Sequence, residues 1–184
     1  KDEKALTSVY NNLGNVYYDL GNFKDAIKYH SLSLSLAKKQ SNQNGIASAH
    51  NNLGIVYYGL HKYRQAIIHN SISLDICKQL EDRAGMARAY SNIAINYDAL
   101  GAYEESVNNC FYALAIHEEI GDEQGKEMVY NNLAVAYFNL GKYKEAEEYG
   151  ITSLSLSEKL GDLKGIKESH QALYNLYNAQ EKYK

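Results

Sequence analysis

The sequence predicts an all-α fold, a solenoid of antiparallel helix pairs with about nine helices. Three observations support this: a repeat every 40 residues, apolar side chains at helical spacing within each repeat, and the absence of proline from all 184 residues. A fixed period of about 20–50 residues is typical of solenoids, and proline is the commonest helix breaker. An aliphatic residue and a tyrosine mark the repeat without gaps: Leu13, Leu53, Ile93, Leu133 and Leu173, and Tyr17, Tyr57, Tyr97, Tyr137 and Tyr177.

Each repeat opens on an aspartate or asparagine, followed by apolar residues at helical spacing. Side-chain oxygens of these residue types accept hydrogen bonds from first-turn N–H groups, so they favour helix starts. The predicted N-caps are Asp2, Asn42, Asp82, Asp122 and Asp162. We therefore divide a single domain, residues 1–184, into repeats 2–41, 42–81, 82–121 and 122–161 and a partial repeat 162–184.

Each complete repeat is predicted to hold two helices joined by a tight turn. The first helix ends near Leu20-Gly21, Leu60-His61, Leu100-Gly101 and Leu140-Gly141. Glycine tolerates the left-handed conformation that closes a helix, and His61 is the exception. The second helix begins near Phe23, Tyr63, Tyr103 and Tyr143, aromatic residues expected to wedge between repeats, and runs to about Gln40, Leu80, Ile120 and Leu160.

Small residues recur where the two helices of a pair should cross, which allows close helix packing. They are Gly14, Gly54, Ala94 and Ala134 on the first helix, with Ala26, Ala66, Ser106 and Ala146 expected opposite them on the second.

Composition argues against several classes of function. A net charge of −3 and a pI near 6.1 predict no nucleic-acid partner and no contact with an anionic membrane. Cys77 and Cys110 occupy different repeat positions, so we expect packing residues, with no disulfide and no metal site. His50 stands where other repeats have tyrosine, which favours aromatic packing, and no histidine forms a metal pair on one helix face. With no nucleophile beside a base, we expect no enzyme and no cofactor.

At this point the residues resemble a known family, the tetratricopeptide repeat. The pattern is Asn12-Leu13-Gly14-x-x-Tyr17-x-x-Leu20-Gly21-x-Phe23-x-x-Ala26, with Asn132-Leu133-Ala134, Tyr143 and Ala146 in a later copy. The period is 40 residues where about 34 is usual, and the proline that often ends the second helix is missing. Such longer units resemble those of spindle-orientation adaptors and of tetratricopeptide regions preceding bacterial sensor histidine kinases and transcription regulators. The resemblance implies a right-handed superhelix.

The resemblance also implies a concave groove lined by the first helix of each pair. Asparagine recurs on the predicted groove face, and an amide can both donate to and accept from a peptide backbone. The predicted peptide-binding residues are Asn12, Asn15, Asn52, Ile55, Arg88, Asn92, Ile95, Met128, Asn132 and Val135. Alternatively, each asparagine bonds to the neighbouring repeat. Ligand contact is favoured for Asn52 and Asn92 because they are central.

A second binding mode of the family, a clamp for a terminal carboxylate, is only partly present. Asn15, Asn52 and Arg88 stand at matching places, but Asn11 and Asn92 replace two expected basic residues. One cation where three are expected weakens a charge-assisted grip.

Our leading hypothesis is a protein-interaction scaffold that binds an extended peptide or a partner helix, as a fragment of a larger protein. The alternative is a ligand- or peptide-sensing region of a bacterial signal-transduction protein, either a histidine kinase or a transcription regulator. A third is self-association through exposed end helices, because Leu173, Leu176 and Tyr183 should lack a partner helix. We expect a cytoplasmic location, or a periplasmic one within a membrane sensor.

Overall fold

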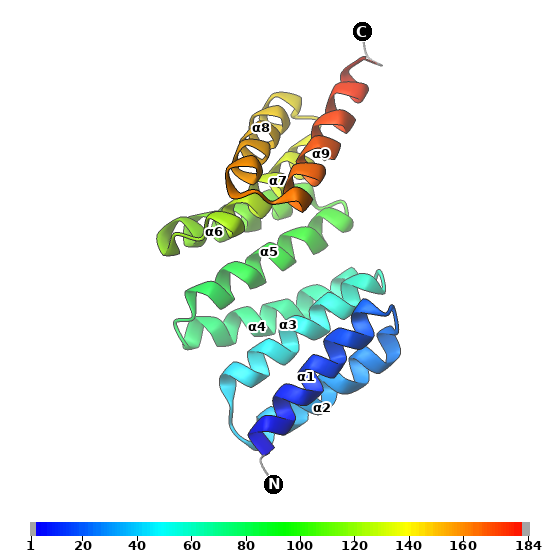
Figure 1. The fold of residues 1–184 in the computed structure, drawn as a ribbon, viewed down its shortest axis with the longest axis vertical. Coiled ribbons are helices and arrows are strands. Elements are labelled where there is room, and N and C mark those ends of the chain that lie inside the picture. Colours follow the sequence, from blue (N-terminus) through cyan, green and yellow to red (C-terminus); the bar gives the residue numbers. More distant parts are fainter. Residues whose placement is uncertain (1–2, 182–184) are drawn as a thin grey trace. The chain divides into compact units, whose positions relative to one another are not determined.

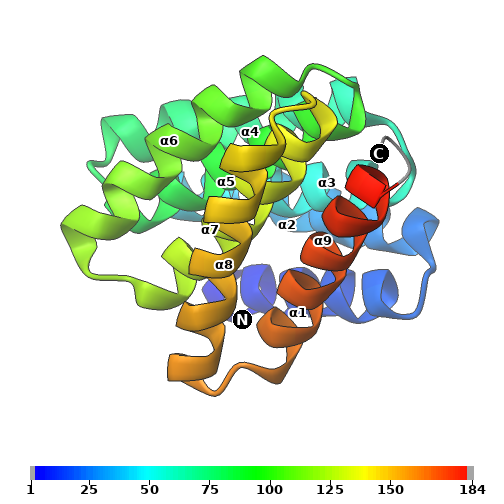
Figure 2. The same cartoon turned by 90° about the horizontal axis from the view of Figure 1, so that it is seen from above.

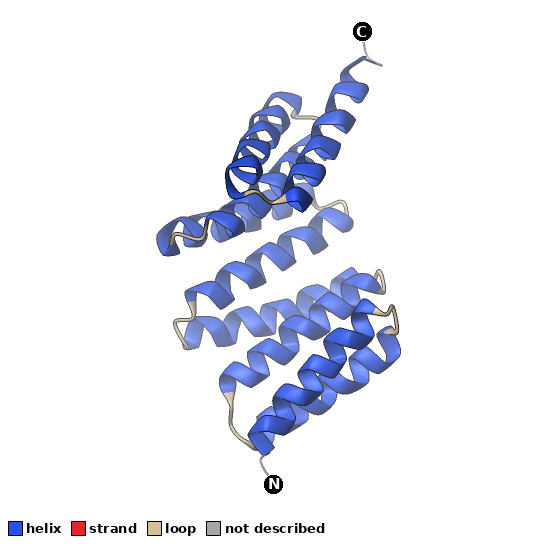
Figure 3. Cartoon of the chain, in the orientation of Figure 1, coloured by secondary structure: helices blue, strands red, loops and turns tan. Residues whose placement is uncertain are grey.

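The structure, a computed structural model, describes residues 3–181, and every regular element in this range is a helix (Figure 3). In chain order the helices are α1 (Glu3–Asp19), α2 (Phe23–Lys39), α3 (Gln43–Gly59), α4 (Tyr63–Gln79), α5 (Arg83–Ala99), α6 (Tyr103–Ile120), α7 (Glu123–Asn139), α8 (Tyr143–Leu160) and α9 (Leu163–Glu181). The predicted all-α helical repeat fold is confirmed. No helix in the described range is long and apolar enough to cross a membrane.

The chain divides into two compact units, Lys1–Asn96 and Tyr97–Lys184. In the first unit, α1 packs on α2, α2 on α3 and α3 on α4, and consecutive helices run antiparallel (Figure 1). In the second unit, α6 packs on α7, α7 on α8 and α8 on α9 (Figure 2). Contacts between α1 and α3, and between α7 and α9, also join the first helices of successive repeats.

The predicted helix starts are confirmed by side-chain caps. The backbone N–H groups of Gly45, Gly85, Gly125 and Gly165 donate to the side-chain oxygens of Asn42, Asp82, Asp122 and Asp162, with N···O distances of 2.9–3.2 Å. Each bond satisfies a first-turn donor that has no partner within the helix. The fifth predicted cap, Asp2, lies outside the described residues.

The predicted left-handed closures after the first helices are also confirmed. Gly21, Gly101 and Gly141 have φ of 72°, 77° and 73°, and His61 has φ of 57°. The second helices close in the same way, with φ of 52° at Ser41 and 55° at Glu81. The sequence did not reveal these two closures because neither residue is a glycine. The equivalent closures in later repeats fall on glycines.

Crossing helices of a pair have side chains of complementary size. A Cβ at Gly14 would overlap the ring of His30, and a Cβ at Gly54 would overlap the amide of Asn70. In the fourth repeat the sizes are exchanged, with Ala134 across from Gly150. The expected residues Ala26, Ala66, Ser106 and Ala146 are indeed buried, but the residues directly opposite Gly14 and Gly54 are larger. This part of the prediction is wrong because it considered small residues alone.

Three repeats contain an aromatic triad, a set of three rings in contact, stacked or tilted, in which the central ring comes from the second helix. The triads are Tyr10–Tyr29–Tyr17, His50–His69–Tyr57 and Tyr130–Tyr149–Tyr137, with neighbouring ring centroids 5.1–6.2 Å apart. Aromatic rings at such distances stabilise the helix pair beyond the area that they bury.

The predicted aromatic wedge between repeats is present in the first repeat, at Phe23, and in the fourth, at Tyr143. Phe23 lies where a Cβ on Gly59 of the next repeat would stand, and Tyr143 packs against the buried cluster of Leu173, Leu176 and Ala146. The expectation that Leu173 and Leu176 lack a partner is therefore wrong, because both are buried against preceding helices. Tyr183 lies outside the described residues. The apolar surface that α9 does expose is formed by Leu163, Tyr174 and Tyr177.

Candidate functional site

The ten predicted groove residues all lie on first helices of repeats, and none is buried. In the first unit they are Asn12 and Asn15 on α1, Asn52 and Ile55 on α3, and Arg88, Asn92 and Ile95 on α5. In the second unit they are Met128, Asn132 and Val135 on α7. The division into repeats therefore places a consistent set of side chains within reach of solvent.

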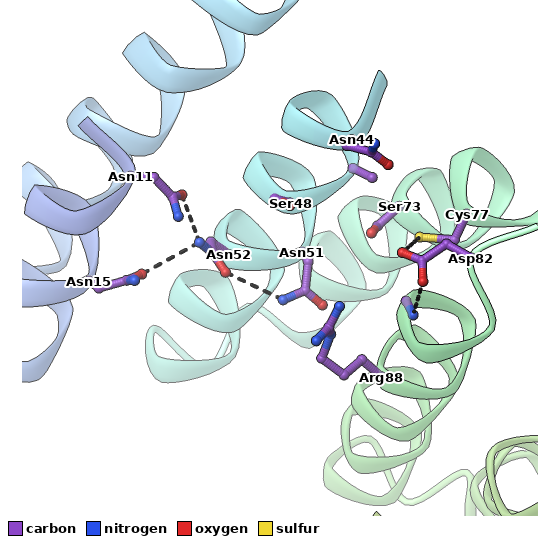
Figure 4. A pocket seen from close by; sticks show the side chains of 12 residues that line it. Asn11, Asn15, Asn44, Ser48, Asn51, Asn52, Ser73, Cys77, Asp82 and Arg88 are labelled. Atoms are coloured by element: carbon purple, nitrogen blue, oxygen red, sulfur yellow. Dashed lines mark hydrogen bonds between the residues drawn. The ribbon is translucent and has the colours of Figure 1, made fainter. Parts of the chain in front are cut away.

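The first unit contains a polar cavity of about 440 Å³, here called the amide pocket (Figure 4). Its wall is formed by Asn11, Asn15, Asn44, Ala47, Ser48, Asn51, Asn52, Ser73, Cys77, Asp82, Gly85 and Arg88. Three predicted residues, Asn15, Asn52 and Arg88, belong to it, and the other seven do not. Five asparagines and two serines supply many hydrogen-bonding groups at one place, a combination that suits a polar ligand.

The asparagine ladder is formed by pairs of residues 41 positions apart. Asn52 Nδ2 donates to Asn11 Oδ1 at 2.8 Å, and Asn92 Nδ2 donates to Asn51 Oδ1 at 2.9 Å. Asn52 and Asn92 thus bond to the preceding repeat, which was the alternative to ligand contact. Sequence reasoning missed the acceptors Asn11 and Asn51, although the doublets Asn11-Asn12 and Asn51-Asn52 were a visible signal.

Further bonds tie Asn52 into this network. Its Oδ1 accepts from Asn51 Nδ2 at 3.4 Å, and its Nδ2 also lies 3.5 Å from Asn15 Oδ1. Asn11 Oδ1 is 3.3 Å from Nδ1 of the buried His30, and burial lowers the pKa of His30 to about 4. The oxygen of Asn11 therefore faces two partners inside the protein, which leaves its Nδ2 group available to the amide pocket.

In the second unit the ladder ends with an unmatched acceptor. Asn131 stands where Asn11 and Asn51 stand, but Ala172 replaces the asparagine that would donate to it. Asn131 Oδ1 is buried and has no hydrogen-bond partner among the described residues. The same offset of 41 residues recurs two turns later in the bond from Asn139 Nδ2 to Asp98 Oδ1, at 3.0 Å. The spacing is thus a property of neighbouring first helices.

Arg88 is an exposed cation in the wall of the amide pocket and makes no ion pair with any described residue. The carboxylate of Asp82, in the same wall, is engaged in capping α5 through Gly85. Cys77 is buried beside it, with Sγ 3.9 Å from Asp82 Oδ2. Burial, together with the Asp82 carboxylate, raises the pKa of the Cys77 thiol. A buried thiol of raised pKa is a packing residue and not a reactive nucleophile.

Several solved structures share the fold. Aspartyl phosphate phosphatase F from Bacillus subtilis superposes with a TM-score of 0.86 over 100% of this chain and 51% of its own, at 18% identity. A Rap protein complexed with competence and sporulation factor also gives 0.86, over 99% and 54%, at 20% identity. Nearly identical repeats of a putative kinesin light chain from Podospora anserina give 0.73, over 98% and 92%, at 17% identity. The chain spans about half the length of the first two proteins.

No sequence among curated proteins matches the chain. Tetratricopeptide repeat families match it over residues 6–71, 45–109 and 128–160, which together cover most of its length. The helix pairs, the caps and the wedged aromatics described above agree with these matches. The chain therefore belongs to the tetratricopeptide repeat family.

Proposed function

We propose that this chain is a protein-interaction scaffold and that the amide pocket of its first unit holds an extended segment of a partner protein or peptide. The observation that carries the proposal is the pocket itself, a cavity of about 440 Å³ lined by asparagine amides and the exposed guanidinium of Arg88. Stacked helical repeats characteristically use the surface of their first helices for binding.

The chemistry of the wall favours a ligand rich in hydrogen-bond acceptors. The ladder engages the oxygens of Asn11 and Asn51, so Asn11 Nδ2 is left to donate to peptide carbonyls, whereas Asn51 Nδ2 already donates one N–H to Asn52 Oδ1 and keeps the second for a ligand. Arg88 adds a fork of N–H donors and a positive charge, which suits a carboxylate on the partner. In this proposal Asn52 and Asn92 orient the side chains of Asn11 and Asn51. Asn11 and Asn51, not Asn52 and Asn92, then contact the partner.

Similar proteins support a peptide or protein partner. The Rap protein cited above was solved with competence and sporulation factor bound. A signal transduction ATPase from Pyrococcus horikoshii, similar over 94% of this chain at 20% identity, carries a tetratricopeptide repeat sensor. This second similarity favours the alternative that the chain is the sensing region of a signalling protein, with the amide pocket as its ligand site.

Selection of peptides from a random display library, followed by calorimetry with the best binder, tests the proposal. Arg88→Gln keeps the size and removes the charge, and we expect it to weaken binding by about tenfold or more. Asn11→Ala with Asn51→Ala should weaken binding similarly. Asn132→Ala, on the same face of the second unit, is the matched control. Selected peptides whose affinity survives both pocket variants, in proteins with unchanged circular dichroism, would refute the assignment.

A further inference from the structure

A smaller cavity repeats the amide pocket one repeat earlier in the chain. It has a volume of about 270 Å³ and is lined by residues of α1, α2 and α3. Eight of its wall residues stand 40 positions before eight wall residues of the amide pocket: Thr7 and Ala47, Ser8 and Ser48, Asn11 and Asn51, Asn12 and Asn52, Ser33 and Ser73, Asn42 and Asp82, Gly45 and Gly85, and Ser48 and Arg88. Both cavities therefore occupy one feature of the repeat, here called the inter-repeat furrow. It lies between the first helices of neighbouring repeats and includes a serine of the second helix, the floor serine.

In the fourth repeat a carboxyl group of the protein itself enters the equivalent furrow. Glu127 stands on α7 where Ala47 stands in the amide pocket, and it is only 2% exposed. Its Oε1 accepts hydrogen bonds from Ser157 Oγ at 2.7 Å and from Ser153 Oγ at 3.2 Å. Ser153 is the floor serine of this repeat and the counterpart of Ser73. The floor of a furrow thus binds a carboxyl group within this molecule.

The floor serines show that the furrows correspond. Ser33 Oγ donates to the backbone carbonyl of Thr7 at 3.1 Å, and Ser153 Oγ donates to that of Glu127 at 3.2 Å. A Cβ at Gly165 would lie 2.7 Å from Glu127 Oε1, so glycine at this position leaves room for the carboxyl group. The equivalent glycine lines both cavities of the first unit.

The amide pocket has no such internal carboxyl group but keeps a donor for one. Ala47 is too short to enter the furrow, and the buried Ser73 lines the cavity together with Arg88 (Figure 4). Cys77 replaces the second serine of the fourth repeat and is only a weak donor. Arg88 stands where the fourth repeat has a glutamate, so the wall gains a positive charge.

The carboxylate of Asp82 in the same wall does not exclude a second carboxylate. Its counterpart Asp162 caps α9 through the N–H of Gly165, the glycine that also borders the carboxyl group of Glu127. A capping aspartate and a second carboxyl group therefore share the furrow of the fourth repeat. In the amide pocket the guanidinium of Arg88 adds a charge of opposite sign, which favours the ionised form of an incoming carboxyl group.

We propose that the floor of the amide pocket binds an acidic side chain of the partner, a glutamate or an aspartate, in the place that Glu127 occupies in the fourth repeat. Ser73 Oγ donates a hydrogen bond to this carboxylate, and Arg88 pairs with it. The Ser73 side chain also hydrogen-bonds Cys77, and its hydroxyl turns to the carboxylate because a charge-assisted bond is stronger. This inference rests on the proposed function and adds the class of residue that the pocket selects.

Peptides selected from a random display library, resynthesised with an amidated C-terminus, test the inference by calorimetry. The amide removes the terminal carboxylate, so any remaining requirement for an acid belongs to a side chain. We expect the selected sequences to share a glutamate or an aspartate. Replacing this residue by glutamine or asparagine should weaken binding by about tenfold or more.

Ser73→Ala removes the donor on the floor and should weaken the acidic peptide roughly tenfold, while its amide analogue binds nearly as before. Such coupling between the two changes is a readout that a loss of packing at Ser73 would not produce. Ser33→Ala is the matched control, because Ser33 is similarly buried and occupies the same repeat position. It should show no coupling to the acidic residue.

Ala47→Glu copies the fourth repeat, so its own carboxyl group should occupy the floor and abolish binding of the acidic peptide. If this variant does not fold, the cycle of Ser73→Ala with the two peptides decides alone. Additive effects in that cycle, or peptides that need Asn11 and Asn51 but bind equally well without the acid, would overturn the inference and leave the proposed function standing. A library that yields no binder would overturn both.

Discussion

Asn52 donates a 2.8 Å hydrogen bond to Asn11, which lies 41 residues earlier in the chain and one repeat away. The bond joins α1 to α3, the first helices of two successive repeats. Asn92 and Asn51 make the equivalent bond. The ladder therefore links successive repeats, and its residues also line or border the candidate binding pocket. Stability and binding can therefore be separated by mutation.

Asn52→Ala should lower the free energy of unfolding by about 1–2 kcal/mol, because it removes the shorter of the two hydrogen bonds to Asn11 Oδ1 and leaves only the contact with His30. Asn12→Ala, at the same repeat position but exposed, should cost under about 0.5 kcal/mol. Urea unfolding followed by circular dichroism measures both. A loss at Asn52 no larger than that at Asn12 would mean that the inter-repeat bond contributes nothing.

The end of the ladder offers the converse test. Ala172→Asn supplies the donor that Asn131 Oδ1 lacks. A new hydrogen bond to a buried orphan gains about 1–2 kcal/mol, against roughly 0.6 kcal/mol of lost helix propensity. We expect a net stabilisation of about 0.5–1 kcal/mol in urea unfolding.

The control for this gain is a double-mutant cycle with Asn131→Ala. In that background the new asparagine has no acceptor, so Ala172→Asn should become destabilising by its helix propensity alone. If both backgrounds respond alike, the new side chain does not reach Asn131.

Much of the fold could be predicted because it depends on local pattern. The caps Asn42 and Asp82, and the closure at His61, follow from residue type and spacing within one repeat. The register between repeats cannot be predicted in this way, because it does not depend on the pattern within one repeat. Which residue faces Asn52 depends on how neighbouring first helices pack, so the sequence left ligand contact and inter-repeat bonding undecided.

Two other contacts could not be predicted for the same reason, because each joins side chains on different helices. His50 was assigned a packing role, which its place in the triad supports, but its contact with His69 spans two helices and is invisible to a search along one helix face. His30 and Asn70 are large residues opposite glycines, and an alignment of repeats shows their sizes without showing which residue each one touches.

Exposed apolar side chains on α9 predict concentration-dependent association. Leu163, 81% exposed, and Tyr174, 64% exposed, leave apolar area in water that a second copy could cover. Leu163→Glu with Tyr174→Glu should abolish any dimer seen by light scattering at high concentration. Leu20→Glu serves as the control, because Leu20 follows the end of α1 and is also exposed. A dimer that persists in the α9 variant would assign association to another surface.

Buried histidines predict a loss of stability in mild acid. Burial lowers the pKa of both His30 and His50 to about 4, whereas an unfolded histidine titrates near 6.5. Between these values the unfolded chain binds more protons than the folded chain, so stability is complete above about pH 6.5 and falls as pH drops toward 4. His30→Asn, which copies Asn70 of the second repeat, should flatten this fall in a series of urea titrations. An unchanged slope would contradict the burial of a neutral ring.

The pair of Gly54 and Asn70 permits the most direct test of packing. Gly54→Ala places a Cβ on the amide of Asn70 and should destabilise the chain by about 1–3 kcal/mol, despite alanine's better helix propensity. Adding Asn70→Ala should restore at least wild-type stability, because it removes the clash and a buried amide that has no partner among the described residues. The fourth repeat shows the spacing of such a pair: a Cβ at Gly150 would lie 3.8 Å from that of Ala134, an ordinary contact, although it would also overlap Leu173 at 2.8 Å. Thermal and urea unfolding of the two single variants and the double variant complete the cycle, and additive effects would show that the two side chains do not compete for one space.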